Sequence, residues 1–170
     1  MKPILAVCIV LLPALAGCAP SDIRPPSHAG PRPAASPAPA PAYPGQETRV
    51  LSQIDAQHLI ENKGLTLQWI DWNHRGSVAV KADTALWTLR GAQTEASGPG
   101  RLFLDGTIAE IGKGYFTFDG TIRITDTPDR GRSCEQNKTW HFAITQNRSY
   151  YRLREFEWCD GLTDYIDIYF

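Results

Sequence analysis

The sequence predicts a mostly β domain over residues 47–170, either a small antiparallel β-barrel or a strongly curved sheet, preceded by one short α-helix. Three observations predict this class. Apolar and polar residues alternate through most of the stretch, which is the period of half-buried strands. Turn-forming residues interrupt the alternation about every 8–15 residues, as in small all-β folds. The tetrapeptide Asp-Gly-Thr-Ile occurs twice, at 105–108 and 119–122, which indicates two equivalent strands.

The helix is expected at residues 53–62. Ser52 followed three residues later by Asp55 is typical of a helix N-cap with an acidic partner. Gly64 is expected to end the helix as its C-cap glycine. A narrow apolar stripe is expected to face the core, and it consists of Ile54, Leu59 and Ile60.

After the helix the apolar period changes to two, which indicates strands. About seven or eight antiparallel strands fit the remaining length of a small barrel. The segments that alternate most clearly are 65–69, 78–81, 85–89, 139–144, 151–154 and 165–170. Turns are expected at 146–149 and 159–161, where small and polar residues gather.

The duplicated tetrapeptide predicts a hairpin with a defined register. A three-residue loop, Gly112-Lys113-Gly114, would place Gly106 opposite Gly120, Thr107 opposite Asp119, and Ile111 opposite Tyr115. The apolar residues of both arms then share one face, which carries Leu102, Leu104, Ile108, Phe116, Phe118, Ile122 and Ile124.

The two paired glycines lie on this apolar face. A strand glycine allows a sharp bend or close packing on the backbone. We therefore expect a corner of the sheet at Gly106 and Gly120, with a tryptophan packed into the gap. The alternative is a cation site formed by Asp105 and Asp119.

The first 18 residues carry a targeting pattern. One basic residue, Lys2, precedes an apolar run over 4–15, and Ala16-Gly17 directly precede Cys18. This pattern resembles the lipobox of bacterial lipoproteins. The resemblance implies a signal peptide over 1–17, a lipid anchor with palmitate-type acyl chains on Cys18, and sorting to the outer membrane, facing the periplasm. An ordinary signal peptide and a membrane-spanning helix are the alternatives, and a span needs about 20 apolar residues.

Residues 18–46 are expected to form a disordered linker behind the lipidated cysteine. Nine of the thirteen prolines lie in 19–46, and Ile23 is the only aliphatic residue there larger than alanine. Such a composition buries too little apolar surface to offset the entropy of ordering. The domain beyond it has 14 Lys and Arg against 17 Asp and Glu, so its charge does not favour a nucleic-acid partner.

Two cysteines remain in the domain, Cys134 and Cys159. An even pair in an exported protein predicts a disulfide. The alternative is a metal site, but neither a further cysteine nor a close histidine pair accompanies them. We therefore expect no metal and no cofactor.

The sequence contains no recognised catalytic motif. His-Glu-x-x-His, Gly-x-Ser-x-Gly and the phosphate-binding loop are absent from it. His58 and His141 have no partner at a meaningful spacing. Asp160, Asp164 and Asp167 do not match the calcium-loop spacing. No catalytic residue is therefore assigned, and an enzyme is less expected than a binding domain.

The candidate ligand-binding residues are aromatic, acidic or basic side chains in loops or on one strand face, namely Trp72, His74, Arg152, Arg154, Tyr165, Asp167 and Tyr169. Aromatic planes beside charged groups suit flat polar ligands such as cell-wall sugars, and outward arginines suit a carboxylate or phosphate. The alternative is that these aromatics are core or cross-strand pairs.

These observations favour a membrane-anchored envelope lipoprotein whose β domain is a non-catalytic binding or structural module for cell-wall glycan or an envelope protein. One alternative is an inhibitor of lysozyme or another envelope hydrolase, since in size and compartment the domain is similar to small β-barrel lipoproteins with that role. A second alternative is a small acid/base hydrolase with converging carboxylates.

Overall fold

The structure is a computed structural model that describes residues 47–170. The predicted signal peptide at 1–17, the lipidation of Cys18 and the linker to residue 46 lie outside the described residues. Within the described part, no helix combines the length and the hydropathy needed to cross a bilayer.

One helix and nine strands are found in residues 47–170. In chain order they are β1 (Arg49–Val50), α1 (Gln53–Ile60), β2 (Leu65–Leu67), β3 (Ser77–Lys81), β4 (Trp87–Thr94), β5 (Arg101–Gly112), β6 (Tyr115–Thr125), β7 (Ser133–Ala143), β8 (Tyr150–Leu153) and β9 (Ile166–Tyr169). The strands follow one another across the sheet in the order β2-β9-β8-β7-β6-β5-β4-β3, and each neighbouring pair is antiparallel.

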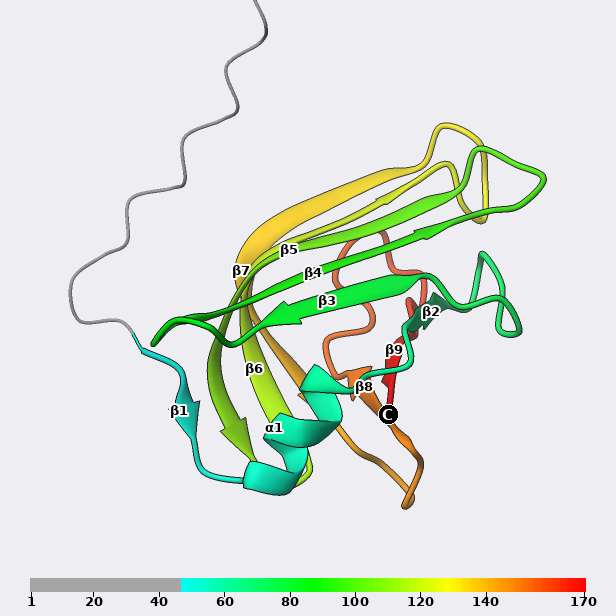
Figure 1. The fold of residues 1–170 in the computed structure, drawn as a ribbon. Helices are drawn as coiled ribbons and strands as arrows, with labels where there is room; N and C mark the ends of the chain where they lie inside the picture. The colour runs from blue at the N-terminus through cyan, green and yellow to red at the C-terminus, as the bar shows by residue number, and fades with distance from the viewer. Residues whose placement is uncertain (1–46) are drawn as a thin grey trace, which may run out of the picture. The chain divides into compact units, whose positions relative to one another are not determined.

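The sheet is nearly closed into a barrel. The two ends of the strand order meet at a bridge between Leu65 and Gly76, whose backbone groups exchange hydrogen bonds of 2.8 and 3.2 Å. β1 adds a short parallel pair to β5, and α1 covers one end of the barrel (Figure 1). The predicted mostly β class with one short helix is therefore confirmed.

The central hairpin β5–β6 has the predicted pairs except at its turn. Gly106 lies opposite Gly120 and Thr107 opposite Asp119. Ala109 is an extra residue in β5, a β-bulge between Ile108 and Glu110. The turn is consequently two residues long, and Ile111 faces Phe116, so the predicted pairing of Ile111 with Tyr115 is wrong. The seven apolar residues predicted for one face are all buried.

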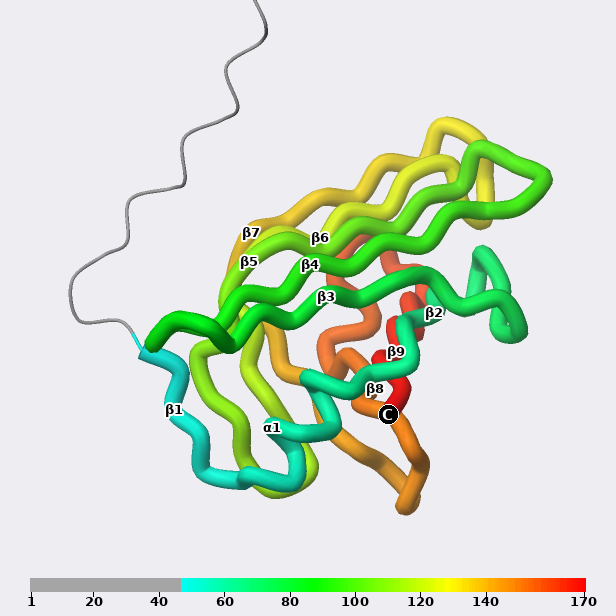
Figure 2. Tube along the Cα trace, in the orientation of Figure 1, coloured from blue at the N-terminus to red at the C-terminus, as the bar shows by residue number. Residues whose placement is uncertain are grey.

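The long strands bend sharply partway along their length (Figure 2). Gly106 and Gly120 lie near the middle of β5 and β6, where a Cβ on Gly106 would come within 2.6 Å of the Gly120 Cα. The aromatic ring against both glycines belongs to Phe118. The ring predicted to be a tryptophan is therefore a phenylalanine. Trp140 lies opposite Phe118 on β7, and its Nε1 donates to the Gly120 carbonyl at 2.9 Å.

The helix begins as predicted but buries a different face. Ser52 is the N-cap and accepts from the Asp55 amide, whereas Glu61 occupies the C-cap in place of Gly64. The residues buried against the barrel are Asp55, Ala56 and Leu59, while Ile54 and Ile60 are 71 and 46% exposed. The predicted apolar stripe is thus wrong at two of its three positions.

Gly64 has a different role from the one predicted. Its φ is +91°, and a Cβ there would lie 2.2 Å from the Gly76 carbonyl oxygen. A glycine is needed because the chain passes directly against the bridge that closes the barrel.

The predicted disulfide between Cys134 and Cys159 is present. Cys134 lies in β7 and is buried, and Cys159 lies in the segment that leads to β9. Their Cα atoms are 5.8 Å apart. The covalent bond therefore ties β7 to the segment between β8 and β9.

Candidate binding surface

Strands β8 and β9 present a row of polar and aromatic side chains on the outside of the barrel. Arg152 pairs with Asp167 across the two strands, and Tyr150 pairs with Tyr169. The alternate residues of the same strands, Tyr151, Leu153, Ile166 and Ile168, are fully buried in the core. The strand period therefore forces the first set of side chains outward.

Asp167 and Arg152 form the centre of this row. Arg152 Nε and Nη2 donate to the two carboxylate oxygens of Asp167 at 2.7 Å each. The Asp167 side chain is fully buried beneath the guanidinium. Burial raises the pKa of Asp167, and Arg152 opposes that shift. The two-pronged ion pair holds the guanidinium plane in a fixed orientation.

Aromatic rings surround the Arg152 guanidinium. Its Cζ lies 4.1 Å from the centre of the Tyr165 ring, 5.2 Å from that of Tyr150 and 6.0 Å from that of Trp72. Each distance is within reach of a cation–π interaction. Trp72 is 44% exposed, so part of its indole is accessible to solvent beside the guanidinium.

The row continues in both directions from Arg152. The rings of Tyr150 and Tyr169 are 5.2 Å apart, and Arg75 Cζ lies 3.8 Å from the Tyr169 ring centre. We call the set the Arg152 surface; it comprises Trp72, Arg75, Arg148, Tyr150, Arg152, Arg154, Phe156, Tyr165, Asp167 and Tyr169.

The Arg152 surface includes six of the seven residues that the sequence selected as ligand-binding candidates. Arg154 lies at its margin, 5.9 Å from the Phe156 ring centre. His74 is the exception, because its Nδ1 lies 2.7 Å from Asp71 Oδ2 and its side chain is 85% exposed. Arg152 Nε and Nη2 donate to the chain's own carboxylate, that of Asp167.

The sequence selection missed four members of the surface. Phe156 is one of them, and it lies in the loop after β8 with its ring 5.4 Å from that of Tyr165. Tyr150 has the same strand parity as Arg152, so the alternation in 150–153 carried a signal for it. Arg75 and Arg148 lie outside the strands, and their contacts with Tyr169 and Tyr150 depend on the tertiary arrangement. Their positions could not have been inferred from spacing.

The Arg152 surface carries excess positive charge. Among residues 47–170, Arg75, Arg148 and Arg154 have no carboxylate oxygen within 4.0 Å. Asp167 forms its close ion pair with Arg152. The positive charge is therefore local, because the same domain contains more acids than bases. Such a patch favours anionic groups on a ligand.

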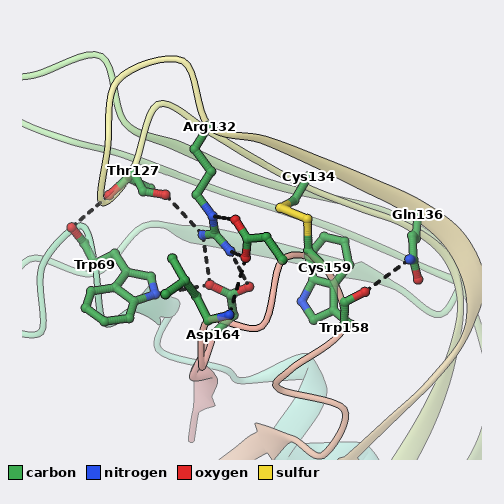
Figure 3. Close-up of a disulfide and its surroundings, with 10 residues drawn as sticks. Trp69, Thr127, Arg132, Cys134, Gln136, Trp158, Cys159 and Asp164 are labelled. Carbon is green, nitrogen blue, oxygen red and sulfur yellow. Dashed lines mark hydrogen bonds and ion pairs between the residues drawn. A yellow bond between two sulfur atoms is a disulfide. The ribbon is translucent and has the colours of Figure 1, made fainter.

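A second ion-pair cluster, of one arginine and two aspartates, lies beside the disulfide (Figure 3). Arg132 donates to both oxygens of Asp160 at 2.8 Å and to both oxygens of Asp164 at 2.9 Å. Asp164 is fully buried and also accepts from Trp69 Nε1 at 3.1 Å. Arg132 holds the pKa of Asp160 at about 2. The cluster is a clamp that joins the β6–β7 turn to the segment before β9.

The acids considered for a cation site are each bonded to other side chains of the domain. Asp160 and Asp164 share Arg132, and Asp167 holds Arg152. Asp105 is paired with Arg90 at 3.1 Å, and Asp119 accepts from the Thr139 hydroxyl. In the described chain, the one group dense enough for a metal is Cys134, Cys159 and Asp160, and its cysteines are disulfide-bonded.

Comparison with known proteins places the same stretch of chain in one family model. The model of the PM1083 family matches residues 47–170. The chain is 33% identical over 122 residues to uncharacterized protein PM1083 of Pasteurella multocida (strain Pm70), which covers 71% of this chain and 78% of that protein. No solved structure matches the chain significantly.

Proposed function

Because this chain belongs to the PM1083 family, whose name specifies neither ligand nor reaction, we propose a function from its own residues. The protein is a lipid-anchored lipoprotein of the bacterial envelope. Its β domain binds cell-wall glycan without catalysis, through the Arg152 surface.

The observation that carries the proposal is the arrangement around Arg152. A guanidinium fixed by Asp167 lies among three aromatic rings, and Trp72 is the most exposed of the three. Sugar rings have apolar faces that stack on such aromatic planes, and their hydroxyl and carboxylate oxygens accept hydrogen bonds from guanidinium groups. Bacterial cell-wall glycan offers both features in a repeating polymer.

The envelope location is supported by two independent features of the chain. Cys18 ends the lipobox-like pattern, and Cys134 and Cys159 are joined in a disulfide, which is typical of an oxidising compartment. The anchor is tested by metabolic labelling with radioactive palmitate. We expect label in the wild-type protein and none in Cys18→Ser; label in neither protein contradicts the anchor.

Binding to cell-wall glycan is tested by cosedimentation of the purified full-length lipoprotein, in detergent, with isolated peptidoglycan. We expect Trp72→Ala and Tyr165→Ala to weaken binding on the order of tenfold, as for central aromatic residues of other interfaces. Phe103→Ala is the matched control, because Phe103 also contacts an arginine, Arg123 at 5.2 Å, but lies on β5. Absence of cosedimentation, or equal losses in all three variants, contradicts the proposal.

A further inference from the structure

The end of the barrel that carries α1 exposes large apolar side chains. Leu51 is 61% and Ile54 71% exposed, the two highest values among the large hydrophobic residues of 47–170. Both line a shallow cavity of about 430 Å³ together with Ile144, His58 and Lys113. We call this cavity the α1 groove.

The exposure of Ile54 is built into the fold. Its neighbour Asp55 is 5% exposed and points inward, where Oδ1 accepts from Tyr151 Oη at 2.7 Å and from the Gly114 amide at 3.1 Å. These bonds fix the rotation of α1 about its axis. Ile54 is therefore held outward, and turning it toward the core would break the bonds of a buried carboxylate.

The charge at the groove favours an anionic partner. Lys113 lies on the rim, in the β5–β6 turn, and no carboxylate oxygen of residues 47–170 lies within 4.0 Å of it. The carboxylate of Asp55, the acid in the groove lining, is bonded to Ser52, Gly114 and Tyr151. Exposed aliphatic side chains beside a lysine are typical of segments that contact anionic lipid surfaces.

The described residues begin close in sequence to this groove. The segment before them ends at residue 46, five positions before Leu51, and the intervening β1 is only Arg49–Val50. In the proposed function, Cys18 of that same segment is embedded in a bilayer. A bilayer is therefore the apolar surface to which the α1 groove is already linked.

We propose that the α1 groove rests on the membrane to which the protein is anchored, with Leu51 and Ile54 in the interfacial layer and Lys113 against anionic headgroups. This inference relies on the lipid anchor of the proposed function. The contact gives the domain a defined orientation relative to the bilayer. The acyl chains supply most of the membrane affinity, and the groove decides which side of the domain faces the bilayer.

The test is the depth of a spin label in the lipidated, full-length protein after reconstitution into vesicles of phosphatidylethanolamine and phosphatidylglycerol. Leu51→Cys and Ile54→Cys each introduce one thiol, and the partners Cys134 and Cys159 are already bonded to each other. Thr88→Cys, at an exposed position on β4, is the control. We expect labels at 51 and 54 to collide several-fold more with oxygen than with a water-soluble nickel chelate, relative to position 88.

Each result decides a separate point. Protein that does not stay with the vesicles contradicts the anchor, and the groove contact with it. Protein that stays on the vesicles with equally water-exposed labels at 51, 54 and 88 overturns the groove contact and leaves the anchor intact. Protection that depends on protein concentration and not on lipid also overturns it, because a second copy would then cover the groove. Leu51→Cys keeps the test valid if Ile54→Cys fails to fold.

Discussion

The Tyr151 hydroxyl donates a 2.7 Å hydrogen bond to the carboxylate of Asp55, although 96 residues separate them. Both groups are buried, and Asp55 also accepts from the Gly114 amide of the β5–β6 turn. Burial and the neighbouring carboxylate raise the pKa of Tyr151. The bond from Tyr151 connects α1 to β8, and the bond from Gly114 connects it to the central hairpin. Together they decide which face of the helix meets the barrel.

Tyr151→Phe is expected to destabilise the domain by about 1–3 kcal/mol, because a buried carboxylate loses a donor that water cannot replace. Tyr150→Phe is the matched control on the same strand. Its ring lies on the outer face, and we expect a change within about 0.5 kcal/mol. Urea unfolding of both variants measures the difference. Equal losses would show that the hydroxyl bond to Asp55 contributes nothing specific.

Arg132→Met is expected to cost about 3–5 kcal/mol at neutral pH, because it leaves the fully buried Asp164 without its cation. Arg130→Met, two residues away and exposed, serves as the control. The free energy of unfolding of each variant is measured in urea at pH 7. Similar small losses in both variants would contradict a role for Arg132 as a clamp.

The same clamp predicts a pH dependence. Arg132 lowers the pKa of Asp160 from 3.8 to about 2 in the folded protein. A lowered folded-state pKa contributes stability that is present above the unfolded pKa and is lost as pH falls through the folded one. We therefore expect stability to drop between about pH 4 and pH 2, and the drop to be smaller in Asp160→Asn. A parallel pH profile for that variant would contradict the assignment.

Arg152→Met is expected to enlarge the stabilising effect of mild acid that the buried Asp167 already contributes. Burial already raises the pKa of Asp167, and Arg152 opposes that shift more than Arg148 does. A raised carboxyl pKa means that the folded state binds a proton more readily, so stability of the variant should rise as pH falls from 7 toward 5. Unfolding midpoints at several pH values test this. In the double variant Arg152→Met/Asp167→Leu this rise in stability should disappear. If it persists, a group other than Asp167 causes it.

The stability lost with the disulfide should not depend on which cysteine is replaced. Cys134→Ser, Cys159→Ser and the double variant are each expected to lose about 3.5 kcal/mol, the chain-entropy value for a loop of about 25 residues. The sequence separation of the two cysteines is 25. Thermal unfolding compares the three. A double variant clearly less stable than both single ones would indicate separate roles for the two residues.

Local pattern alone predicted much of this protein. The two-residue period of the strands, the repeated Asp-Gly-Thr-Ile, the Ser52 N-cap and the pair of domain cysteines are properties of neighbouring or paired positions. Such properties depend on short-range geometry, which is why the Gly106–Gly120 pair and the seven buried hairpin residues could be assigned in advance. The position of Trp72 in a loop and the outward parity of Tyr165 and Tyr169 were likewise visible.

The tertiary structure decided what no single segment contains. The bulge at Ala109 moved Ile111 opposite Phe116, and the bonds from Tyr151 and Gly114 turned Asp55 inward and Ile54 outward. The pairing of β2 with β9 brings the loop that follows β2, with Trp72, toward Arg152. Sequence by itself determined which residues alternate and pair; only the closed sheet determined which of them meet, because contacts between distant segments depend on how every intervening strand curves and packs.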